Sequence, residues 1–226
     1  MKGSKKLEEL KRGLKWRLTG KEEYGKSWYR DNSDWYKQIH DSNHLIHNNF
    51  KDYLKSKSDV VSILEVGCGS GVYPIKNKNL FDGKNYTGLD ISPDAIDLCK
   101  QNSGFEFICG DIIKMNTEKK YDLVYSHAVI DHVYDIDTFT TKLLDATKKY
   151  LYLHSYRGYF PDLKNHKPNW FEIEGIYYND VSIPQIKKVL LDYGLKDSEF
   201  KIYSLKSGQT DKNVDVQLVI EVEKTQ

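Results

Sequence analysis

The stretch that decides the fold of this chain is Ile63-Leu64-Glu65-Val66-Gly67-Cys68-Gly69-Ser70-Gly71. The apolar run that leads into it, residues 60–66, predicts a buried β-strand. Three glycines follow at alternate positions, and glycine accepts positive φ angles and lets the backbone approach a ligand closely. The next segment, residues 72–80, can begin a helix because Pro74 falls in its first turn. A strand, a glycine turn and a helix in this order predict the first unit of a nucleotide-binding α/β domain.

The length and composition of the chain favour a globular protein. Its 226 residues suit one domain with an added lobe, and 39% hydrophobic residues argue against a disordered chain. The net charge of +1 argues against a nucleic-acid binder driven by overall charge. No apolar run has membrane-spanning length, and the N-terminus lacks the apolar segment of a signal peptide. We therefore expect a cytoplasmic protein, and three cysteines without metal-ligand spacing fit that reducing compartment.

Acidic residues stand at the ends of the next two predicted strands. Residues 84–89 form the second strand, which ends at Asp90, and a helix capped by Ser92 follows it. Asp90 lies about twenty residues beyond the glycine turn, where an α/β nucleotide site places a carboxylate on the ribose hydroxyls. The third strand, residues 105–109, is followed by Asp111, which is either a second ligand contact or the N-cap of a helix.

Histidines lie at the ends of the fourth and fifth predicted strands. His127 ends the fourth strand and is followed by Asp131 and His132, while His154 ends the fifth. The carboxyl ends of parallel strands face the ligand crevice, and histidine titrates near neutral pH. These three histidines are therefore the candidate catalytic bases, with Asp131 able to orient one of them. A structural or cleft-lining role for His132 is an open alternative.

The rest of the chain predicts an alternating α/β order with one insertion. The remaining predicted elements are strands at 121–127 and 149–154, helices at 137–147 and 183–193, and a closing hairpin of strands 201–205 and 214–223. The insertion, residues 156–182, is aromatic and rich in loops, and it predicts a substrate lid in which Tyr156 and Arg157 contact the acceptor. A packed surface excursion is the alternative.

Residues 1–57 predict an N-terminal helical cap, with one helix over residues 35–55. Trp28, Tyr29 and Tyr36 in this cap either contact the cofactor and substrate or pack the added helix. The first 26 residues are basic and have leucines at roughly helical spacing. They predict an amphipathic helix on the domain, with contact to a membrane surface or an anionic substrate as the alternative.

The motifs between Glu65 and His132 resemble those of the class I S-adenosylmethionine-dependent methyltransferases. The glycine turn with its preceding acid matches motif I, E/D-x-G-x-G-x-G, and residues 88–92 and 110–112 match motifs II and III. The string after the fourth strand is similar to the L-E-H-V of small-molecule members of types 11 and 12, with Asp131 in place of the usual Glu. The resemblance implies a Rossmann-like, seven-stranded, mostly parallel sheet with an antiparallel C-terminal hairpin, in a domain over residues 58–226.

The resemblance also implies which residues hold S-adenosylmethionine. The acid before the turn orders it, the glycines pass the methionine part, and the acid after the second strand holds the ribose. The acid after the third strand approaches the adenine amino group, and the next residue packs on the ring. The cofactor-binding residues expected on this basis are Glu65, Gly67, Gly69, Gly71, Asp90, Ile91, Asp111, Ile112 and His127.

Missing motifs narrow the acceptor. The chain has no Asn/Asp-Pro-Pro-Tyr after the fourth strand and no Pro-Cys nucleophile, which argues against methylation of nucleic-acid bases. A small molecule remains, methylated on oxygen rather than nitrogen, with a carbohydrate as the preferred class because aromatic rings can stack on sugars. The alternatives are a small-molecule N-methyltransferase, an RNA methyltransferase that uses the basic N-terminus, and a cofactor-binding or partner-binding module without catalysis.

Four polar residues after the fourth strand, Asp131, His132, Asp135 and Asp137, raise the question of a metal site. Some oxygen methyltransferases use a divalent ion to acidify vicinal hydroxyls. The spacing is not a recognised ligand set, however, and a polar loop that opens the next helix explains it equally well. We therefore expect no metal. The sequence leaves the oligomeric state open, a homodimer among the alternatives.

Overall fold

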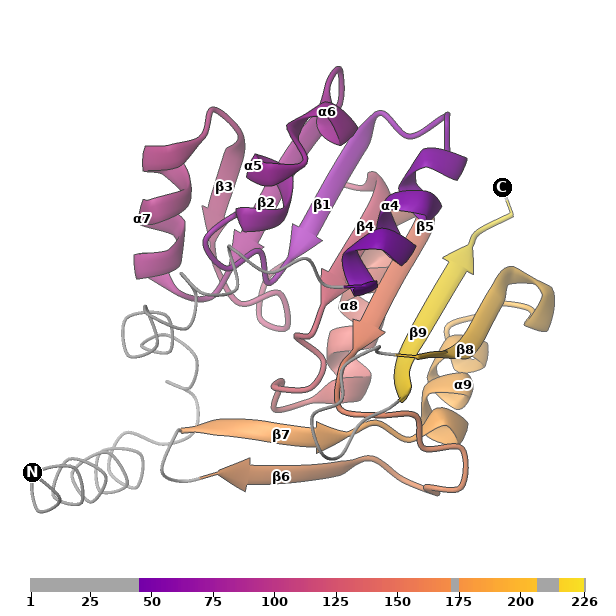
Figure 1. Ribbon diagram of the computed structural model, residues 1–226. Helices are drawn as coiled ribbons and strands as arrows, with labels where there is room; N and C mark the ends of the chain where they lie inside the picture. Colours follow the sequence, from indigo (N-terminus) through magenta and orange to yellow (C-terminus); the bar gives the residue numbers. More distant parts are fainter. Residues whose placement is uncertain (1–44, 172–174, 207–215, 226) are drawn as a thin grey trace, which may run out of the picture.

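The core of the protein is one mixed β-sheet, as the computed structural model shows (Figure 1). The structure describes residues 45–171, 175–206 and 216–225. Seven strands lie side by side in the order β3-β2-β1-β4-β5-β9-β8. Their bounds are β1 Ser62–Val66, β2 Asn85–Asp90, β3 Glu106–Cys109, β4 Tyr121–His127, β5 Thr147–Ser155, β8 Phe200–Lys206 and β9 Val216–Glu223. The first five strands pair in parallel, whereas β9 runs antiparallel to both β5 and β8.

Burial of the central strands explains this parallel arrangement. β1 and β4 pair in the middle of the sheet, with Ile63 opposite Leu123 and Leu64 opposite Val124. All four side chains are buried. Such continuous apolar runs are typical of parallel strands that are covered by helices on both faces. The predicted Rossmann-like sheet with an antiparallel C-terminal hairpin is therefore confirmed.

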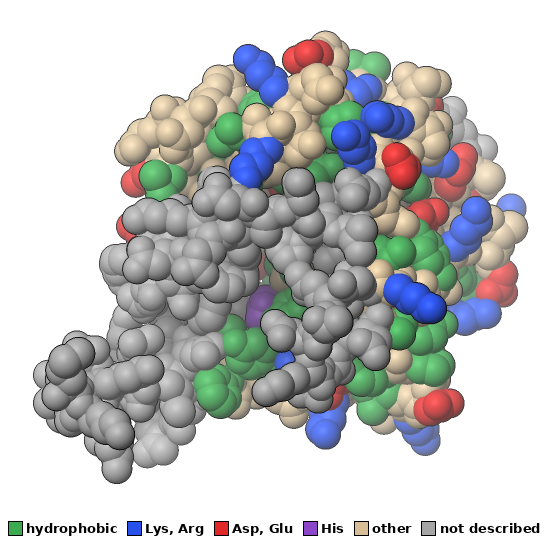
Figure 2. Space-filling view, viewed as in Figure 1, with side chains coloured by type: hydrophobic (Ala, Val, Ile, Leu, Met, Phe, Trp, Pro, Cys, Tyr) green, Lys and Arg blue, Asp and Glu red, His purple; other side chains and the backbone are tan. Residues whose placement is uncertain are grey.

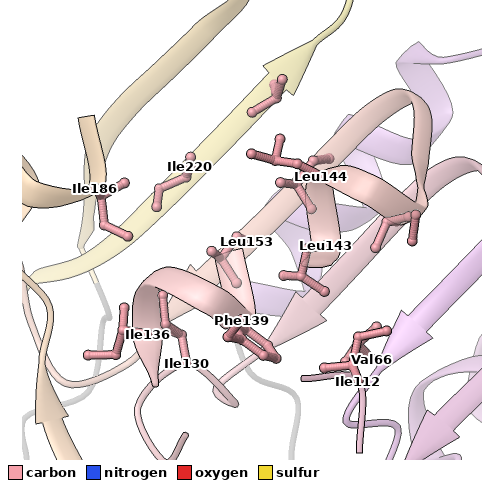
Figure 3. Packing of buried hydrophobic residues seen from close by; sticks show 14 of the residues in the cluster. Val66, Ile112, Ile130, Ile136, Phe139, Leu143, Leu144, Leu153, Ile186 and Ile220 are labelled. Carbon is pink, nitrogen blue, oxygen red and sulfur yellow. The ribbon is translucent and has the colours of Figure 1, made fainter. Parts of the chain in front are cut away.

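Helices pack on both faces of the sheet (Figure 1). Their bounds are α4 Leu45–Ser56, α5 Val72–Lys76, α6 Lys78–Phe81, α7 Pro93–Asn102, α8 Ile136–Ala146, α9 Ile183–Asp192 and the 3-10 helix η2 Asp197–Glu199. Successive strand residues point to opposite faces. Ile63 accordingly packs in one apolar cluster with Phe50 of α4, while Leu64 packs in the other with Leu143 of α8. Figure 3 shows this second cluster, where Leu143 lies between α8 and the sheet.

Local side-chain chemistry sets several helix boundaries. Ser92 caps α7, and its Oγ accepts a hydrogen bond from the Ala95 N–H, as its place before Pro93 predicts. The helix predicted over residues 72–80 is instead two helices that meet at Asn77. The Asn77 side chain donates to the Tyr73 carbonyl at 3.0 Å, and such a side-chain bond offers the backbone an alternative to continuing the helix.

The segment between β5 and α9 contains a two-stranded antiparallel hairpin, β6 Lys167–Phe171 and β7 Ile176–Asp180. It lies across the carboxyl ends of the parallel strands (Figure 1). Residues 156–182 are thus more regular than the loop-rich segment that the sequence predicts, and their role as a lid stays a prediction. Trp28, Tyr29 and Tyr36 lie outside the described residues. Of the predicted cap, the described part is α4. No helix in the described ranges is both long and apolar enough to cross a bilayer.

Candidate active site

The glycine turn after β1 is held by backbone bonds to β2. Gly67, Gly69 and Gly71 all have positive φ angles, between 53° and 79°. The N–H groups of Gly67 and Cys68 both donate to the Leu89 carbonyl, at 2.7 and 3.1 Å. These bonds fasten the turn to the end of the neighbouring strand.

The absence of a side chain at Gly67 lets the loop after β4 approach the turn. A Cβ atom at Gly67 would lie 2.1 Å from the Val129 Cγ2 atom, far inside contact distance. Val129 belongs to residues 128–133, which we call the β4 exit loop. The glycine turn and the β4 exit loop therefore touch each other, and only glycine fits between them.

Asp90 connects the glycine turn to the start of α7. One carboxylate oxygen accepts from the Gly69 N–H and the other from the Ser92 N–H, both at 2.8 Å. Burial raises the pKa of the Asp90 carboxyl above its usual value, and these two backbone bonds oppose the rise. The two carboxylate oxygens have four lone pairs, and the N–H groups of Gly69, Ser92 and Ile91 act on them, which leaves capacity for a further donor such as a ribose hydroxyl.

Glu65 lies beneath the turn and does not order it as the sequence predicts. Glu65 as a residue is 5% exposed, and its carboxyl accepts a hydrogen bond from the Tyr86 hydroxyl of β2. Burial raises the pKa of Glu65 to about 7, which the phenols of Tyr86 and Tyr125 oppose. The Leu89 carbonyl, the Asp90 carboxylate and the Cys99 thiol all bond to the turn.

Asp111 lies after β3, near the same edge of the sheet. Its carboxylate accepts from the Ile113 N–H and from the Tyr134 hydroxyl, both at 3.0 Å. Ile112 is 4% exposed and packs beside Val66 in the apolar cluster (Figure 3). The predicted packing of Ile112 on the adenine ring stays a prediction. Ile91, next to Asp90, is partly exposed.

The three predicted histidines have different surroundings. His127, at the end of β4, has the rings of Phe50 and Tyr125 within 4.8 and 5.2 Å. His154 is fully buried, and its Nε2 atom lies 3.1 Å from the Gln217 amide oxygen of β9. β5 ends one residue later, at Ser155, and His154 is the register partner of His127 on β4. His154 is thus a buried partner of Gln217, and its contact with substrate stays a prediction.

His132 connects three segments. Its Nδ1 atom lies 2.7 Å from the Tyr177 carbonyl oxygen of β7, and its Nε2 atom lies 3.3 Å from the Tyr156 hydroxyl. A carbonyl oxygen only accepts, so Nδ1 carries the hydrogen and Nε2 accepts from Tyr156. Burial lowers the pKa of His132 to about 4, and the nearby Arg157 charge contributes. His132 is therefore a neutral imidazole with a fixed tautomer.

Asp131 supports the segment after β5 and does not orient a histidine as predicted. Its buried carboxylate accepts from the Ser155 hydroxyl at 2.6 Å and from the N–H groups of Tyr156 and Arg157 at 3.3 Å. Burial raises the pKa of Asp131 to about 6, against the effect of these bonds. Asp131 thus fixes the backbone that carries the two predicted acceptor contacts.

Arg157 lies between the end of β5 and the hairpin. Its Nη2 atom forms an ion pair with Asp180 at 3.0 Å, and its guanidinium lies 5.3 Å from the centre of the Tyr178 ring. The Nε–H group is buried and has no hydrogen-bond partner within the described ranges. Figure 2 shows one histidine side chain next to hydrophobic side chains.

The acidic residues at the start of α8 have separate partners. Asp135 caps α8 through the Thr138 N–H, and Asp137 bonds to His166 and Gln185. Across the part of the chain that the structure describes, no group of three possible metal ligands comes together.

A comparison with protein-family models matches residues 57–213 to the methyltransferase domain family. This match covers more than half of the chain. The chain belongs to this family. The class I S-adenosylmethionine-dependent methyltransferase that the motifs predict is confirmed as its family, and S-adenosylmethionine is the cofactor of the domain.

Curated relatives of this methyltransferase domain match it over a short region. The malonyl-[acyl-carrier protein] O-methyltransferase 2 of Ilyobacter polytropus is 38% identical over 85 residues, 36% of this chain and 33% of the relative. The chain thus spans about a third of the length of the curated relatives it matches.

Solved structures resemble the methyltransferase domain over most of its length. The plantazolicin methyltransferase BpumL with S-adenosylhomocysteine covers 100% of both chains, with a TM-score of 0.61 and 16% identity. The magnesium protoporphyrin IX methyltransferase of Synechocystis PCC 6803, also with S-adenosylhomocysteine, covers 88% of this chain and 98% of its own, with a TM-score of 0.62 and 17% identity. At this identity the likeness shows the fold.

Three residues of the methyltransferase domain escape sequence reasoning: Tyr86, Tyr134 and Asn179. Tyr86 and Tyr134 bond to the predicted acids Glu65 and Asp111. No motif predicts them, because each reaches its partner from another strand or loop through the tertiary fold. Asn179 lies on the hairpin, for which the sequence predicts no strand.

Proposed function

We propose that this protein transfers a methyl group from S-adenosylmethionine to an oxygen atom of a small-molecule acceptor. The observation that carries the proposal is the meeting of His132, Tyr156 and Arg157 after β4 and β5. His132 bonds to the Tyr156 hydroxyl, and both His132 and Arg157 lie beside the Tyr178 ring. In open α/β sheets, ligands bind at this edge of the sheet. The hairpin adds Trp170, whose ring lies 5.0 Å from that of Tyr177, as an aromatic wall.

The cofactor would be held by the glycine turn and the acids after β2 and β3. We assign the methionine part to the turn at Gly67–Gly71, the ribose to Asp90 and the adenine to Asp111. The Asp90 carboxylate, which lies beside the turn and bonds to the Gly69 N–H, suits a ligand with hydroxyl groups. When bound, S-adenosylmethionine supplies a methyl group on a sulfonium sulfur, which an in-line nucleophile accepts.

The chemistry of His132 bears on which oxygen is methylated. A general base works best with a pKa near the operating pH, and the pKa of His132 is about 4. His132 therefore suits the role of holding the Tyr156 phenol better than that of deprotonating a sugar hydroxyl. We infer that the acceptor oxygen is already nucleophilic, as in a carboxylate.

Arg157 supports the same inference. It presents a cation near Tyr156, and Asp180 occupies one of its five N–H donors. A carboxylate could bind the remaining donors. Among the relatives are malonyl-[acyl-carrier protein] O-methyltransferases, and the malonyl group in that name carries a carboxylate. The carbohydrate acceptor that the sequence favours, and the N-methyltransferase alternative, stay predictions without comparable support.

The test is formation of S-adenosylhomocysteine with matched acceptor probes. The malonyl thioester of N-acetylcysteamine carries a carboxylate, and the acetyl thioester is the same molecule without it. A methyl glucoside and a primary amine represent the sugar and nitrogen alternatives. The proposal expects product with the malonyl probe, and about a tenfold or larger loss in Arg157→Gln with cofactor affinity retained. Turnover of the glucoside or the amine alone would refute the carboxylate assignment, and cofactor binding without turnover of any acceptor in a cell extract would favour a non-catalytic module.

A further inference from the structure

A buried asparagine on the hairpin binds the β4 exit loop. Asn179 of β7 is fully buried, and its Nδ2 group donates to the carbonyls of Ile130 and Val133, at 2.9 and 2.7 Å. Its backbone N–H donates to the Asp131 carbonyl at 2.7 Å. One hairpin residue thus satisfies three carbonyl groups of the β4 exit loop.

The donors of Asn179, and not its oxygen, account for its presence at this position. Its Oδ1 atom is buried and has no hydrogen-bond partner among the described residues. Leaving a buried polar atom unsatisfied is unfavourable. The contribution of the Asn179 amide therefore comes from its N–H groups, which bond to the β4 exit loop.

The loop that Asn179 holds has an unusual backbone. Ala128 has a φ of 58°, the one positive value at a non-glycine residue in the described ranges. Residues rarely keep such a conformation unless surrounding contacts determine it. The Ala128 N–H donates to the His154 carbonyl at 3.0 Å, and His132 bonds to the Tyr177 carbonyl. With Asn179, these bonds hold the loop from β5 on one side and from the hairpin on the other.

The β4 exit loop also touches the glycine turn. Val129 lies so close to Gly67 that a Cβ atom there would come within 2.1 Å of it. Ile130 is fully buried in the apolar cluster (Figure 3). The hairpin, the β4 exit loop and the glycine turn therefore form a continuous series of contacts.

We propose that Asn179 is a positioning residue for methyl transfer. From the hairpin, it holds the β4 exit loop against the glycine turn. The hairpin, the loop and the turn then move as one unit, which fixes the distance between the acceptor at the hairpin and the cofactor at the turn. This role rests on the proposed function only in assigning the acceptor to the hairpin and the cofactor to the glycine turn. A consequence is energetic coupling, because any ligand that orders the hairpin also orders the turn, and the reverse.

The test compares Asn179→Asp with Asn169→Asp. Asn169 lies on β6 of the same hairpin, and its Nδ2 group bonds to the carbonyls of Lys167 and Tyr178 within the hairpin. The aspartate at position 179 would place oxygen atoms opposite two carbonyl oxygens and release the loop. The readouts are S-adenosylmethionine affinity by calorimetry, hydrogen exchange at residues 128–133, and thermal unfolding.

We expect Asn179→Asp to bind S-adenosylmethionine about tenfold more weakly or worse and to exchange faster at residues 128–133, with Asn169→Asp close to wild type. If Asn179→Asp does not fold, Asn179→Ser, which retains one donor, should show the same effects at smaller size. A folded Asn179 variant with faster loop exchange and unchanged cofactor affinity would overturn the proposal, as would equal effects at position 169. Because the readouts need no acceptor, they are independent of whether the proposed acceptor is correct.

Discussion

Gly67→Ala should weaken cofactor binding and Gly83→Ala should not, although the two glycines have almost the same backbone conformation. Gly67 has a φ of 79° and Gly83 a φ of 73°. An added Cβ atom at Gly83 would meet nothing within 4 Å, whereas at Gly67 it would lie 2.1 Å from Val129. Gly83→Ala therefore measures the cost of the positive φ by itself.

The magnitude follows from these two terms. A left-handed backbone conformation costs a non-glycine residue about 1–2 kcal/mol. Ordinary contact begins at 3.4 Å, so Val129 must withdraw from its 2.1 Å position by the difference, about 1.3 Å. Overpacking of this kind typically costs about 1–3 kcal/mol more. Since Val129 lies in the β4 exit loop against the glycine turn, we expect the displacement to reduce cofactor affinity about tenfold or more.

The assay measures the free energy of unfolding by chemical denaturation and S-adenosylmethionine affinity by calorimetry. The expected result is that Gly67→Ala loses about 1–3 kcal/mol more stability than Gly83→Ala and binds the cofactor weakly. Equal stability losses, or wild-type cofactor affinity in Gly67→Ala, would refute the reasoning that this contact sets the turn.

Three further predictions concern buried titratable groups. The pKa of Glu65 is raised to about 7, so its neutral form stabilises the fold at low pH and this contribution is lost as pH rises through 7. Glu65→Gln should therefore gain roughly 2–3 kcal/mol in unfolding free energy relative to wild type between pH 5 and pH 8, and a pH-independent difference would contradict this. The pKa of His132 is lowered to about 4, so the neutral imidazole stabilises the fold above pH 6.5, and this stabilisation is lost as pH falls toward 4. An NMR titration of His132 with a midpoint near 6.5 would count against its buried geometry. Asp131→Asn places an amide N–H against one of the two backbone N–H groups after β5 and should lower the free energy of unfolding by about 1–3 kcal/mol. An unchanged free energy of unfolding would show that these bonds contribute little.

The parts of the fold that follow from local chemistry are predictable from the sequence. The apolar run before Gly67 and the cap at Ser92 are determined by nearby residues, and both are present. The hairpin is different, because its stability comes from distant contacts. Asn179 bonds to carbonyls nearly fifty residues earlier in the chain, at Ile130 and Val133. Pro168 and the polar residues around it give no alternating apolar pattern that would predict a strand.

The site shows the same division. The pattern correctly places Asp90 at the end of β2 and His132 in the loop after β4. It does not determine where each side chain points. His154 is buried beside Gln217 of β9, and Glu65 faces Tyr86 because that phenol lies on the neighbouring strand. The cofactor and acceptor roles of the individual residues stay predictions until they are measured.

The measurement that most directly tests the account is a calorimetric titration of wild type, Asp90→Ala and Asp97→Ala with S-adenosylmethionine. Asp97 lies on the exposed side of α7 and serves as the matched control. We predict about micromolar affinity in wild type and Asp97→Ala, and at least about a tenfold loss in Asp90→Ala. Unchanged affinity in Asp90→Ala, or no binding by the wild type, would contradict the claim that the glycine turn and Asp90 form the cofactor site.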